Sequence, residues 1–139
     1  VGAIHAGWRG VLAGVIDNAL KLMEKKGANI SRIIAAIGPC IGFKSYEVGE
    51  EFKIRFLKSD PNNEGYFSNG KRPGKHNFDL SGYVRYRLRR IGVEYISHFE
   101  CDTCADEDTF FSYRRSVLNG EDNYGRGISL IAIAGQVSQ

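Results

Sequence analysis

Apolar residues follow one another along the chain in two patterns, short continuous runs and helical spacings, and their alternation predicts an α/β fold. Residues 1–5 and 32–38 are runs of small and apolar residues, typical of buried strands. From Val11 to Met23 apolar residues recur three or four positions apart, which predicts a helix that ends near Gly27. Strand, helix and strand in this order indicate a βαβ unit with a right-handed crossover.

Two further helices are predicted downstream. Residues 46–57 place Val48, Phe52 and Phe56 four positions apart, so that all three face the same side of a helix. Asp79 can cap the start of a third helix, in which apolar residues again recur at helical spacing. Both helices are therefore expected to pack one apolar face against a sheet.

The remaining predicted elements are two strands and a long loop. Residues 93–99 are rich in β-branched and aromatic residues, and residues 127–135 are apolar enough to form a central strand. The polar residues 59–75 contain many turn formers and predict a surface loop with a short hairpin near Tyr66 and Phe67. We therefore expect one mixed sheet with helices packed against it.

Length and composition are those of a single globular domain spanning residues 1–139. Hydrophobic residues make up 42% of the chain, and no run of 18 apolar residues predicts a membrane span. The net charge of +3 permits an anionic substrate but does not favour nucleic acid. Three cysteines do not form a secreted disulfide framework, so a reducing, cytoplasmic location is predicted.

His5 is the first candidate for chemistry, because it ends a predicted strand just before a glycine turn and a helix. Ligands of α/β proteins bind at such junctions. An imidazole can ligate a metal or act as a general base, and Arg9 in the following turn could hold a phosphate together with backbone N–H groups. The alternative is structural: His5 hydrogen-bonds the turn and Trp8 fills the core.

The cysteines offer less specific candidates. Cys40 follows the second predicted strand, where it could pair with His5 on Zn²⁺ or in a nucleophilic dyad, or simply be a small buried residue of a turn. His98, Cys101 and Cys104 have the spacing of zinc ligands but lack a second matching pair. A redox pair is disfavoured, since no helix opens after the first of these cysteines.

Arginines supply the candidates for anion binding. Residues 108–116 contain two adjacent Phe that we expect to anchor the segment in the core, leaving Arg114 or Arg115 to clamp an anion or to form a surface salt bridge. Arg126, between two glycines, is a further candidate. His76 is expected to be a loop histidine without a catalytic role.

Four segments resemble a known family when they are taken together: "HAGWRG" (5–10), "IGPCIG" with "YEVG" (37–42 and 46–49), "FFSYRR" (110–115) and "GRG" before the last apolar run. They resemble the YfiH-like laccase-domain family, also called the multicopper polyphenol oxidase or purine nucleoside phosphorylase family. The resemblance extends to about residue 134 and implies an α/β fold similar to that of the cytotoxic-necrotizing-factor-like cysteine hydrolases.

The resemblance also implies a mononuclear Zn²⁺ site formed by two histidines and a cysteine. His5 matches the last of these ligands, whereas Cys40 is not at a ligand position and the other two ligands lie upstream in family chains. The sequence starts without Met and inside a predicted strand. We therefore expect it to be the carboxyl-terminal portion of a longer chain. This portion by itself is expected to bind zinc poorly and to be inactive unless the missing part is supplied.

The function implied by the resemblance is phosphorolysis of adenosine, inosine or methylthioadenosine, with deamination of adenosine. The older family name implies copper-dependent oxidation of polyphenols, but three widely separated histidines cannot build several copper sites. A single zinc ion with Arg9, Arg114 and Arg126 on phosphate is sufficient for the purine reaction. A polyphenol oxidase and a non-catalytic nucleoside-binding module remain the alternatives.

Overall fold

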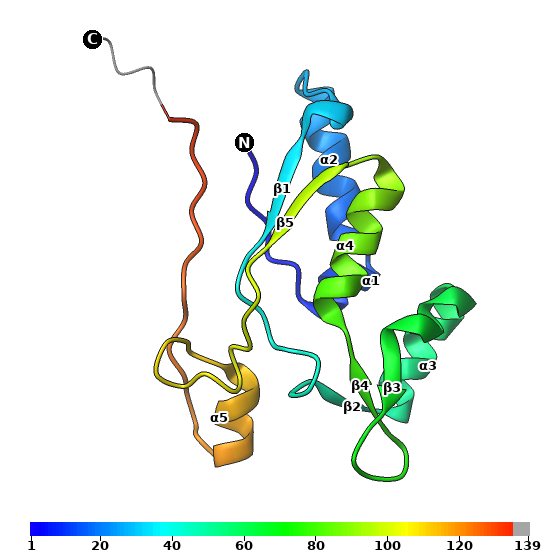
Figure 1. The fold of residues 1–139 in the computed structure, drawn as a ribbon, viewed down its shortest axis with the longest axis vertical. Coiled ribbons are helices and arrows are strands. Elements are labelled where there is room, and N and C mark those ends of the chain that lie inside the picture. Colours follow the sequence, from blue (N-terminus) through cyan, green and yellow to red (C-terminus); the bar gives the residue numbers. More distant parts are fainter. Residues whose placement is uncertain (135–139) are drawn as a thin grey trace.

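The structure, a computed structural model, describes residues 1–134 and contains two small sheets with helices packed against them (Figure 1). The strands are β1 (Ile34–Ile37), β2 (Glu47–Gly49), β3 (Phe67–Asn69), β4 (Lys75–Phe78) and β5 (Tyr95–His98). β1 pairs with β5 in parallel, and β2, β4 and β3 form an antiparallel sheet in that order. The predicted mixture of α and β structure is confirmed. The predicted single sheet is wrong, because the two groups of strands share no hydrogen-bonded pair in the described residues.

The helices are α1 (Trp8–Leu12), α2 (Val15–Lys25), α3 (Glu50–Ser59), α4 (Leu80–Ile91), α5 (Tyr113–Asn119) and two short 3₁₀ helices, Ile30–Arg32 and Pro61–Tyr66. The first predicted helix is divided at Gly14, whose φ of 84° is a left-handed conformation that ends α1 and redirects the chain. Throughout residues 1–134, every helix falls short of what is needed to cross a bilayer.

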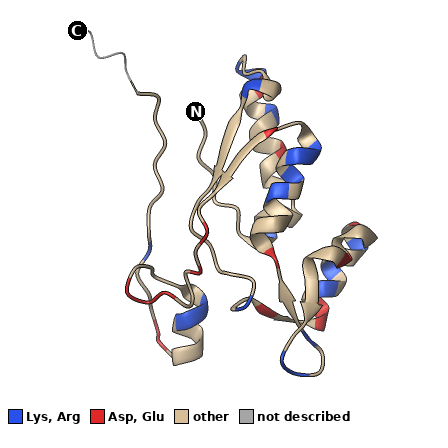
Figure 2. Cartoon of the chain, viewed as in Figure 1, with Lys and Arg blue, Asp and Glu red and all other residues tan. Residues whose placement is uncertain are grey.

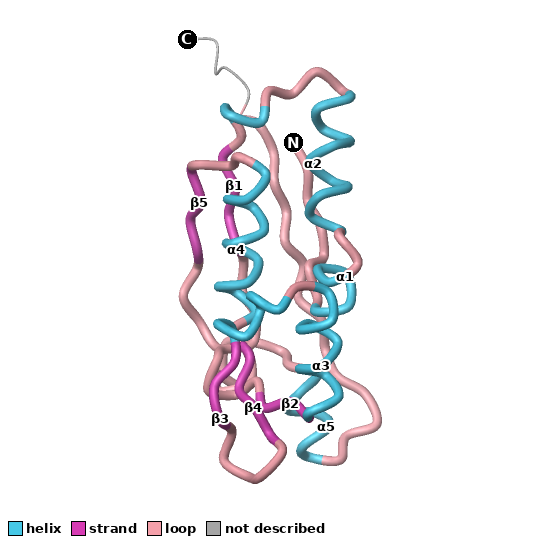
Figure 3. Tube along the Cα trace, turned by 90° about the vertical axis from the view of Figure 1, so that its right-hand side faces the viewer, coloured by secondary structure: helices cyan, strands magenta, loops and turns pink. Residues whose placement is uncertain are grey.

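Helices α2 and α4 contact each other, and α4 packs along the pair β1–β5 (Figure 3). Ala35, Ile37 and Ile96 of these strands pack toward the core, whereas Ile34 and Tyr95 point to the opposite, exposed face. The alternation follows from the two-residue period of a strand. The carboxyl ends of the parallel strands meet at one edge, and the loops that follow them carry the residues of interest.

The two terminal strands that the pattern predicts are absent from the described residues. Residues 1–5 and 127–134 are extended but pair with no other strand there, and Ile128 is 83% exposed. A strand is stabilised only when a neighbour takes up its backbone hydrogen bonds, so apolar composition alone does not form one. Gly135, the end of the predicted last strand, lies outside the described residues.

Local signals in the middle of the chain are mostly confirmed. The predicted hairpin is the pair β3–β4, and the Oδ1 atom of Asp79 accepts a 2.8 Å hydrogen bond from the Gly82 N–H at the start of α4. The helix predicted over residues 46–57 begins only at Glu50, because the preceding residues pair with β4 and place Val48 opposite His76. Cross-strand pairing therefore overrides helical periodicity at this point.

A cluster of aromatic rings forms the core between α3, α4 and the antiparallel sheet. Phe56 and Phe78 are fully buried, with ring centroids 4.7 Å apart, and Tyr83 packs edge-on against Phe56 at 5.1 Å. Phe52 joins them to Trp8 at 4.7 Å. Offset and edge-on contacts of this kind add to the free energy gained by burying the rings.

We expect Phe56→Ala to lower the free energy of unfolding by about 3–5 kcal/mol, because it leaves a cavity in the centre of this cluster. Urea unfolding followed by circular dichroism measures the change. Ile54→Ala, on the exposed side of the same helix, is the matched control and should cost less than about 1 kcal/mol. Equal losses in the two variants would contradict the assignment of the core.

Candidate functional site

A cleft of about 420 Å³ lies between the β3–β4 turn, β2 and α5. We call it the hairpin cleft, and it is lined by Lys44, Ser45, Glu47, Lys71, Arg72, Lys75, Asn77, Cys104, Arg114 and Leu118. In Figure 2 the β3–β4 turn and α5 both carry lysine or arginine positions, as do the longer helices. Five cationic side chains face one carboxylate, so the electrostatic potential of the cleft favours an anionic ligand.

Glu47 joins the walls of the hairpin cleft. Its carboxylate accepts hydrogen bonds from the Arg72 side chain at 2.8 Å and from the Lys71 backbone N–H at 3.0 Å. These two bonds, the one from Arg72 first, lower the pKa of Glu47 below its ordinary value. The Glu47 carbonyl in turn accepts a 2.6 Å bond from Nη1 of Arg114. One residue of β2 therefore contacts both the turn and α5.

Arg9 and Arg114, predicted separately as phosphate ligands, act on the same tyrosine. The Arg114 guanidinium lies 5.2 Å from the centre of the Tyr46 ring, and both arginines are close enough to favour the ionised phenol. Burial outweighs them and raises the pKa of Tyr46 to about 12. At neutral pH the Tyr46 hydroxyl is therefore a hydrogen-bond donor in a positive environment.

Arg115 has a structural role. Its guanidinium donates to the carbonyls of Thr103 at 2.9 Å, Cys104 at 3.1 Å and Phe110, and so holds the loop that precedes α5. The expectation that both phenylalanines anchor this segment is wrong for Phe111, which is 63% exposed. The sequence pattern did not predict the helix α5. The buried side chains here are two serines, Ser112 at the N-cap of α5 and Ser116 within it.

Helix α5 carries capping signals that could have revealed it. Ser112 accepts a hydrogen bond from the Arg115 N–H, and Gly120 ends the helix in a left-handed conformation with a φ of 69°. A serine and a glycine eight positions apart mark such a short helix. The basic turn at residues 71–75 was a second overlooked signal of the site.

His5 and Arg126 lie at the surface. The His5 ring is folded against Gly7, where an added Cβ would come within 2.8 Å of Nε2 and would require this exposed ring to move. Arg126 lies 4.5 Å from the centre of the Tyr124 ring and donates to the Tyr124 carbonyl at 3.0 Å. Its contacts are therefore local, to Asn123 and Tyr124.

The described residues do not complete a metal site. No three His, Cys, Asp or Glu side chains come together there in a way that could hold an ion. The disfavoured zinc site at His98, Cys101 and Cys104 receives no support from these residues; β5 ends at the histidine, whose Nδ1 lies 3.4 Å from a nitrogen of Arg85. His5, the predicted zinc ligand, therefore has no companion ligands in residues 1–134.

His76 also differs from its prediction. It lies in β4 rather than in a loop, and its Nε2 atom is 2.6 Å from a carboxylate oxygen of Glu50. The hydrogen bond from His76 is the largest of the effects that lower the pKa of Glu50. The contact fastens α3 to the antiparallel sheet and does not serve the cleft.

The loops after β1 and β5 meet beside the hairpin cleft at Asp102, which the sequence did not single out. Ser45 donates a 2.6 Å hydrogen bond to its carboxylate, and the backbone N–H of Cys104 donates at 3.0 Å. Burial alone would raise the pKa of Asp102, but these bonds and those from the Gly42 and Ala105 N–H groups lower it below its ordinary value.

Cys40 lies in the same region as a half-buried thiol. Burial first, and then the nearby Cys101 and Asp102, raise the pKa of Cys40 to about 11. A thiol with so high a pKa is a poor nucleophile at neutral pH. The two open hypotheses that pair Cys40 with His5 receive no support, since no hydrogen bond joins these side chains in residues 1–134.

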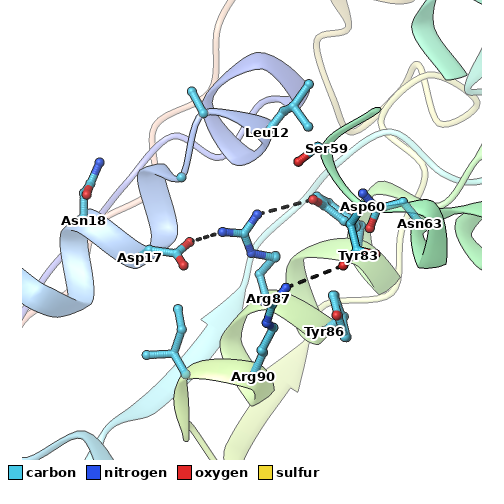
Figure 4. Close-up of a pocket in the computed structure, with 13 residues that line it drawn as sticks. Leu12, Asp17, Asn18, Ser59, Asp60, Asn63, Tyr83, Tyr86, Arg87 and Arg90 are labelled. Carbon is cyan, nitrogen blue, oxygen red and sulfur yellow. Dashed lines mark hydrogen bonds and ion pairs between the residues drawn. The ribbon is translucent and has the colours of Figure 1, made fainter. Parts of the chain in front are cut away.

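A second cleft, of about 550 Å³, lies between α2, α4 and the end of α3 (Figure 4). Its charged groups pair with one another: Arg87 contacts Asp17 at 2.5 Å and the Tyr83 hydroxyl at 3.3 Å, and Arg90 lies 3.7 Å from Asp60. Because these pairs satisfy each other, the cleft offers little free charge to a ligand. Its ion pairs hold the surrounding helices together, and we do not assign the site to this cleft.

Comparison with protein families and with known sequences shows where the chain is similar. The model of the family described as "Multi-copper polyphenol oxidoreductase laccase" matches residues 1–134. The purine nucleoside phosphorylase RC0672 of Rickettsia conorii is 37% identical over 116 residues, which are 84% of this chain and 48% of the relative. The purine nucleoside phosphorylase YfiH of Escherichia coli is 36% identical over 120 residues, 86% of this chain and 47% of the relative.

Solved structures show the same partial overlap. Neisseria meningitidis protein NMB0706 has a TM-score of 0.71 and 34% identity, over 80% of this chain and 44% of that protein. The hypothetical protein YfiH of Bacillus licheniformis has a TM-score of 0.73 and 26% identity, over 81% and 43%. This chain therefore spans about half the length of the relatives that it matches.

Cys40 is expected to react slowly with iodoacetamide. With a pKa of about 11, roughly 0.1% of the thiol is ionised at pH 8, so its alkylation rate should rise about tenfold per pH unit up to pH 10. Mass spectrometry of the peptide that contains Cys40 measures the rate. The same peptide in urea is the control, and a rate in the folded protein that levels off below pH 9 would contradict the raised pKa.

Asp102→Asn should destabilise the protein at pH 7. Because the pKa of Asp102 is lowered by folding, its ionised form stabilises the fold above its ordinary pKa of 3.8, and this contribution is lost as pH falls through the folded value. Urea unfolding at pH 7, 5 and 3 should show the gap from the wild type closing at the acid end. Glu107→Gln, at an exposed position nearby, should follow the wild type at every pH; a constant gap for Asp102→Asn would contradict the mechanism.

Proposed function

We propose, because the chain belongs to the multi-copper polyphenol oxidoreductase laccase family, that it takes part in the phosphorolysis of purine nucleosides. Adenosine, inosine and methylthioadenosine are the proposed nucleosides, and deamination of adenosine is the proposed second reaction. Relatives at 36–37% identity are named purine nucleoside phosphorylases, which supports this choice within the family.

The observation that carries the proposal is the stacking of the Arg114 guanidinium on the Tyr46 ring, with the charge of Arg9 as a weaker influence on the same phenol. Phosphorolysis requires a phosphate dianion to be held while one of its oxygens bonds to C1′ of the ribose. The bond from C1′ to the purine nitrogen breaks, and its electron pair leaves with the base, which takes up a proton. Arg9 and Arg114 bring positive charge to Tyr46, whose neutral hydroxyl can donate to the same phosphate.

His5 is proposed as the catalytic and metal-ligating residue, four positions before Arg9 in the turn that opens α1. Zinc would supply a Lewis acid in the complete site. Since residues 1–134 contain no companion ligands for His5, no step of the reaction is assigned to the metal. Arg126 remains a proposed phosphate ligand on the segment after α5.

The name of the family favours a second candidate, copper-dependent oxidation of polyphenols. Multicopper oxidation requires clustered histidine and cysteine ligands. His76 and His98 lie in different sheets, and the described residues contain no ligand cluster. The described residues therefore give the oxidase no copper ligands of its own, and the names of the relatives support the purine reaction.

The proposal is tested by incubating the full-length protein with inosine and phosphate and following hypoxanthine and ribose-1-phosphate by chromatography, with and without a chelator. Arg114→Lys should raise the KM for phosphate about tenfold, because lysine cannot reproduce the planar array of N–H donors. Arg89→Lys, at an exposed position on α4, is the matched control and should leave the KM unchanged.

Product formation no greater than that of His5→Ala would overturn the proposal. Binding of inosine by calorimetry without any turnover would instead identify a nucleoside-binding module. Oxidation of a phenolic dye by the copper-loaded protein would favour the oxidase.

A further inference from the structure

We infer that the hairpin cleft is a binding site for ligands that carry two or more linked phosphates, such as a nucleoside triphosphate or an inorganic polyphosphate. The inference concerns binding at the β3–β4 turn; it shares Arg114 with the proposed phosphorolysis, but it is tested by binding alone and by a residue of the turn, Lys71. It rests on the shape of the turn, the balance of charge in the cleft and the size of the cleft.

The turn holds its cationic residues in a defined loop. The Gly70 N–H donates to the Lys75 carbonyl at 2.8 Å, and the Lys75 N–H donates to the Arg72 carbonyl at 3.1 Å. A Cβ at Gly70 would lie 2.7 Å from the Lys75 backbone, and Gly74 has a φ of 71°, so both glycines are required for this closure. Because the loop is closed before a ligand arrives, less conformational entropy is lost on binding.

The charge of the cleft is largely uncompensated. Among the described residues that line it, Glu47 is the one carboxylate, and it is already bound to Arg72. Within the described part of the chain, Lys44, Lys71 and Lys75 form no ion pair. The lining residues carry five positive charges and one negative charge, a surplus of four that falls to three when the neighbouring Asp102 is counted, and this surplus favours linked phosphates over a single phosphate.

The opposite wall adds a donor of fixed orientation. Arg114 uses Nη1 to bond the Glu47 carbonyl at 2.6 Å, and this bond positions the guanidinium while its other N–H groups are available to phosphate oxygens. Asn77 on β4 and Ser45 add neutral polar groups between the two cationic walls. A chain of phosphates lying across the cleft would therefore meet lysines on the turn side and an arginine on the α5 side.

The extent of the positive charge selects a small ligand over a nucleic acid. The cationic residues surround a cleft of about 420 Å³, large enough for a triphosphate with part of a nucleoside, and do not form a long stripe. The cleft between α2 and α4 has a similar volume but pairs its own charges, so volume alone does not select the site.

Calorimetric titration of the full-length protein, without metal and at low salt, tests the inference with five probes: tripolyphosphate, ATP, AMP, orthophosphate and adenosine. Tripolyphosphate and ATP should bind roughly tenfold or more tightly than orthophosphate and AMP, and their affinity should fall as NaCl is added. ATP that binds more tightly than tripolyphosphate would identify a nucleotide site, whereas equal affinities would identify a site for the phosphate chain alone. Both results support the inference.

Lys71→Glu should weaken tripolyphosphate binding about tenfold or more, because it reverses a charge in the cleft at an exposed turn position. Lys26→Glu, beyond the end of α2, makes the same change in net charge away from the cleft and should have less than about a twofold effect. Thermal unfolding of both variants verifies that they are folded.

Three results would overturn the inference. They are no binding of tripolyphosphate by the wild type, equal loss in the Lys71→Glu and Lys26→Glu variants, and orthophosphate binding as tight as that of tripolyphosphate. A single-stranded oligonucleotide that displaces tripolyphosphate at lower concentration than ATP would assign the cleft to nucleic acid instead. None of these readouts measures turnover, so they are independent of the phosphorolysis assay.

Discussion

The contact between Phe56 and Phe78 organises the middle of this protein. It joins α3 to β4 at a ring distance of 4.7 Å, and both side chains are fully buried. The Phe78 N–H also donates to the Tyr46 carbonyl at 3.1 Å, so the residue that anchors the core also places the tyrosine of the site. The antiparallel sheet is small, and burial of these rings supplies stability that its few ladder hydrogen bonds do not.

Beside this aromatic core, Glu47 links the two walls of the hairpin cleft. It follows Tyr46 directly, and its carboxylate and carbonyl together contact the basic turn and α5. A carboxylate in a cationic cleft reduces the repulsion among its neighbours, and its low pKa keeps it ionised at neutral pH. The remaining surplus of positive charge is available to a ligand, which links the proposed phosphate chemistry to the inferred polyphosphate site.

The segment between β5 and α5 is held by polar contacts rather than by regular structure. Asp102 accepts hydrogen bonds from Ser45 and from nearby backbone N–H groups, while Arg115 donates hydrogen bonds to backbone carbonyls. These two charged residues satisfy donors and acceptors that a helix or strand would otherwise pair internally. Both charges stabilise the loop. The adjacent arginines therefore differ: Arg115 binds loop carbonyls, whereas Arg114 lines the hairpin cleft.

The sequence by itself determined the elements whose signals are local: the helices of the central region, the cap at Asp79, the hairpin, and the strands β1 and β5. It also singled out Arg9, and Arg114 or Arg115, as candidate anion ligands, because arginines beside glycines and aromatic residues are conspicuous in the chain.

Only the tertiary structure decided which strands pair, and it left residues 1–5 and 127–134 without a partner in the described chain. It alone showed that Arg9 and Arg114 share Tyr46, that Asp102 accepts a hydrogen bond from Ser45 more than fifty residues earlier, and that the basic turn faces α5. The physical reason is distance along the chain. Helical periodicity and caps act within a few residues, whereas sheet pairing and clefts depend on contacts between segments that are brought together only by folding.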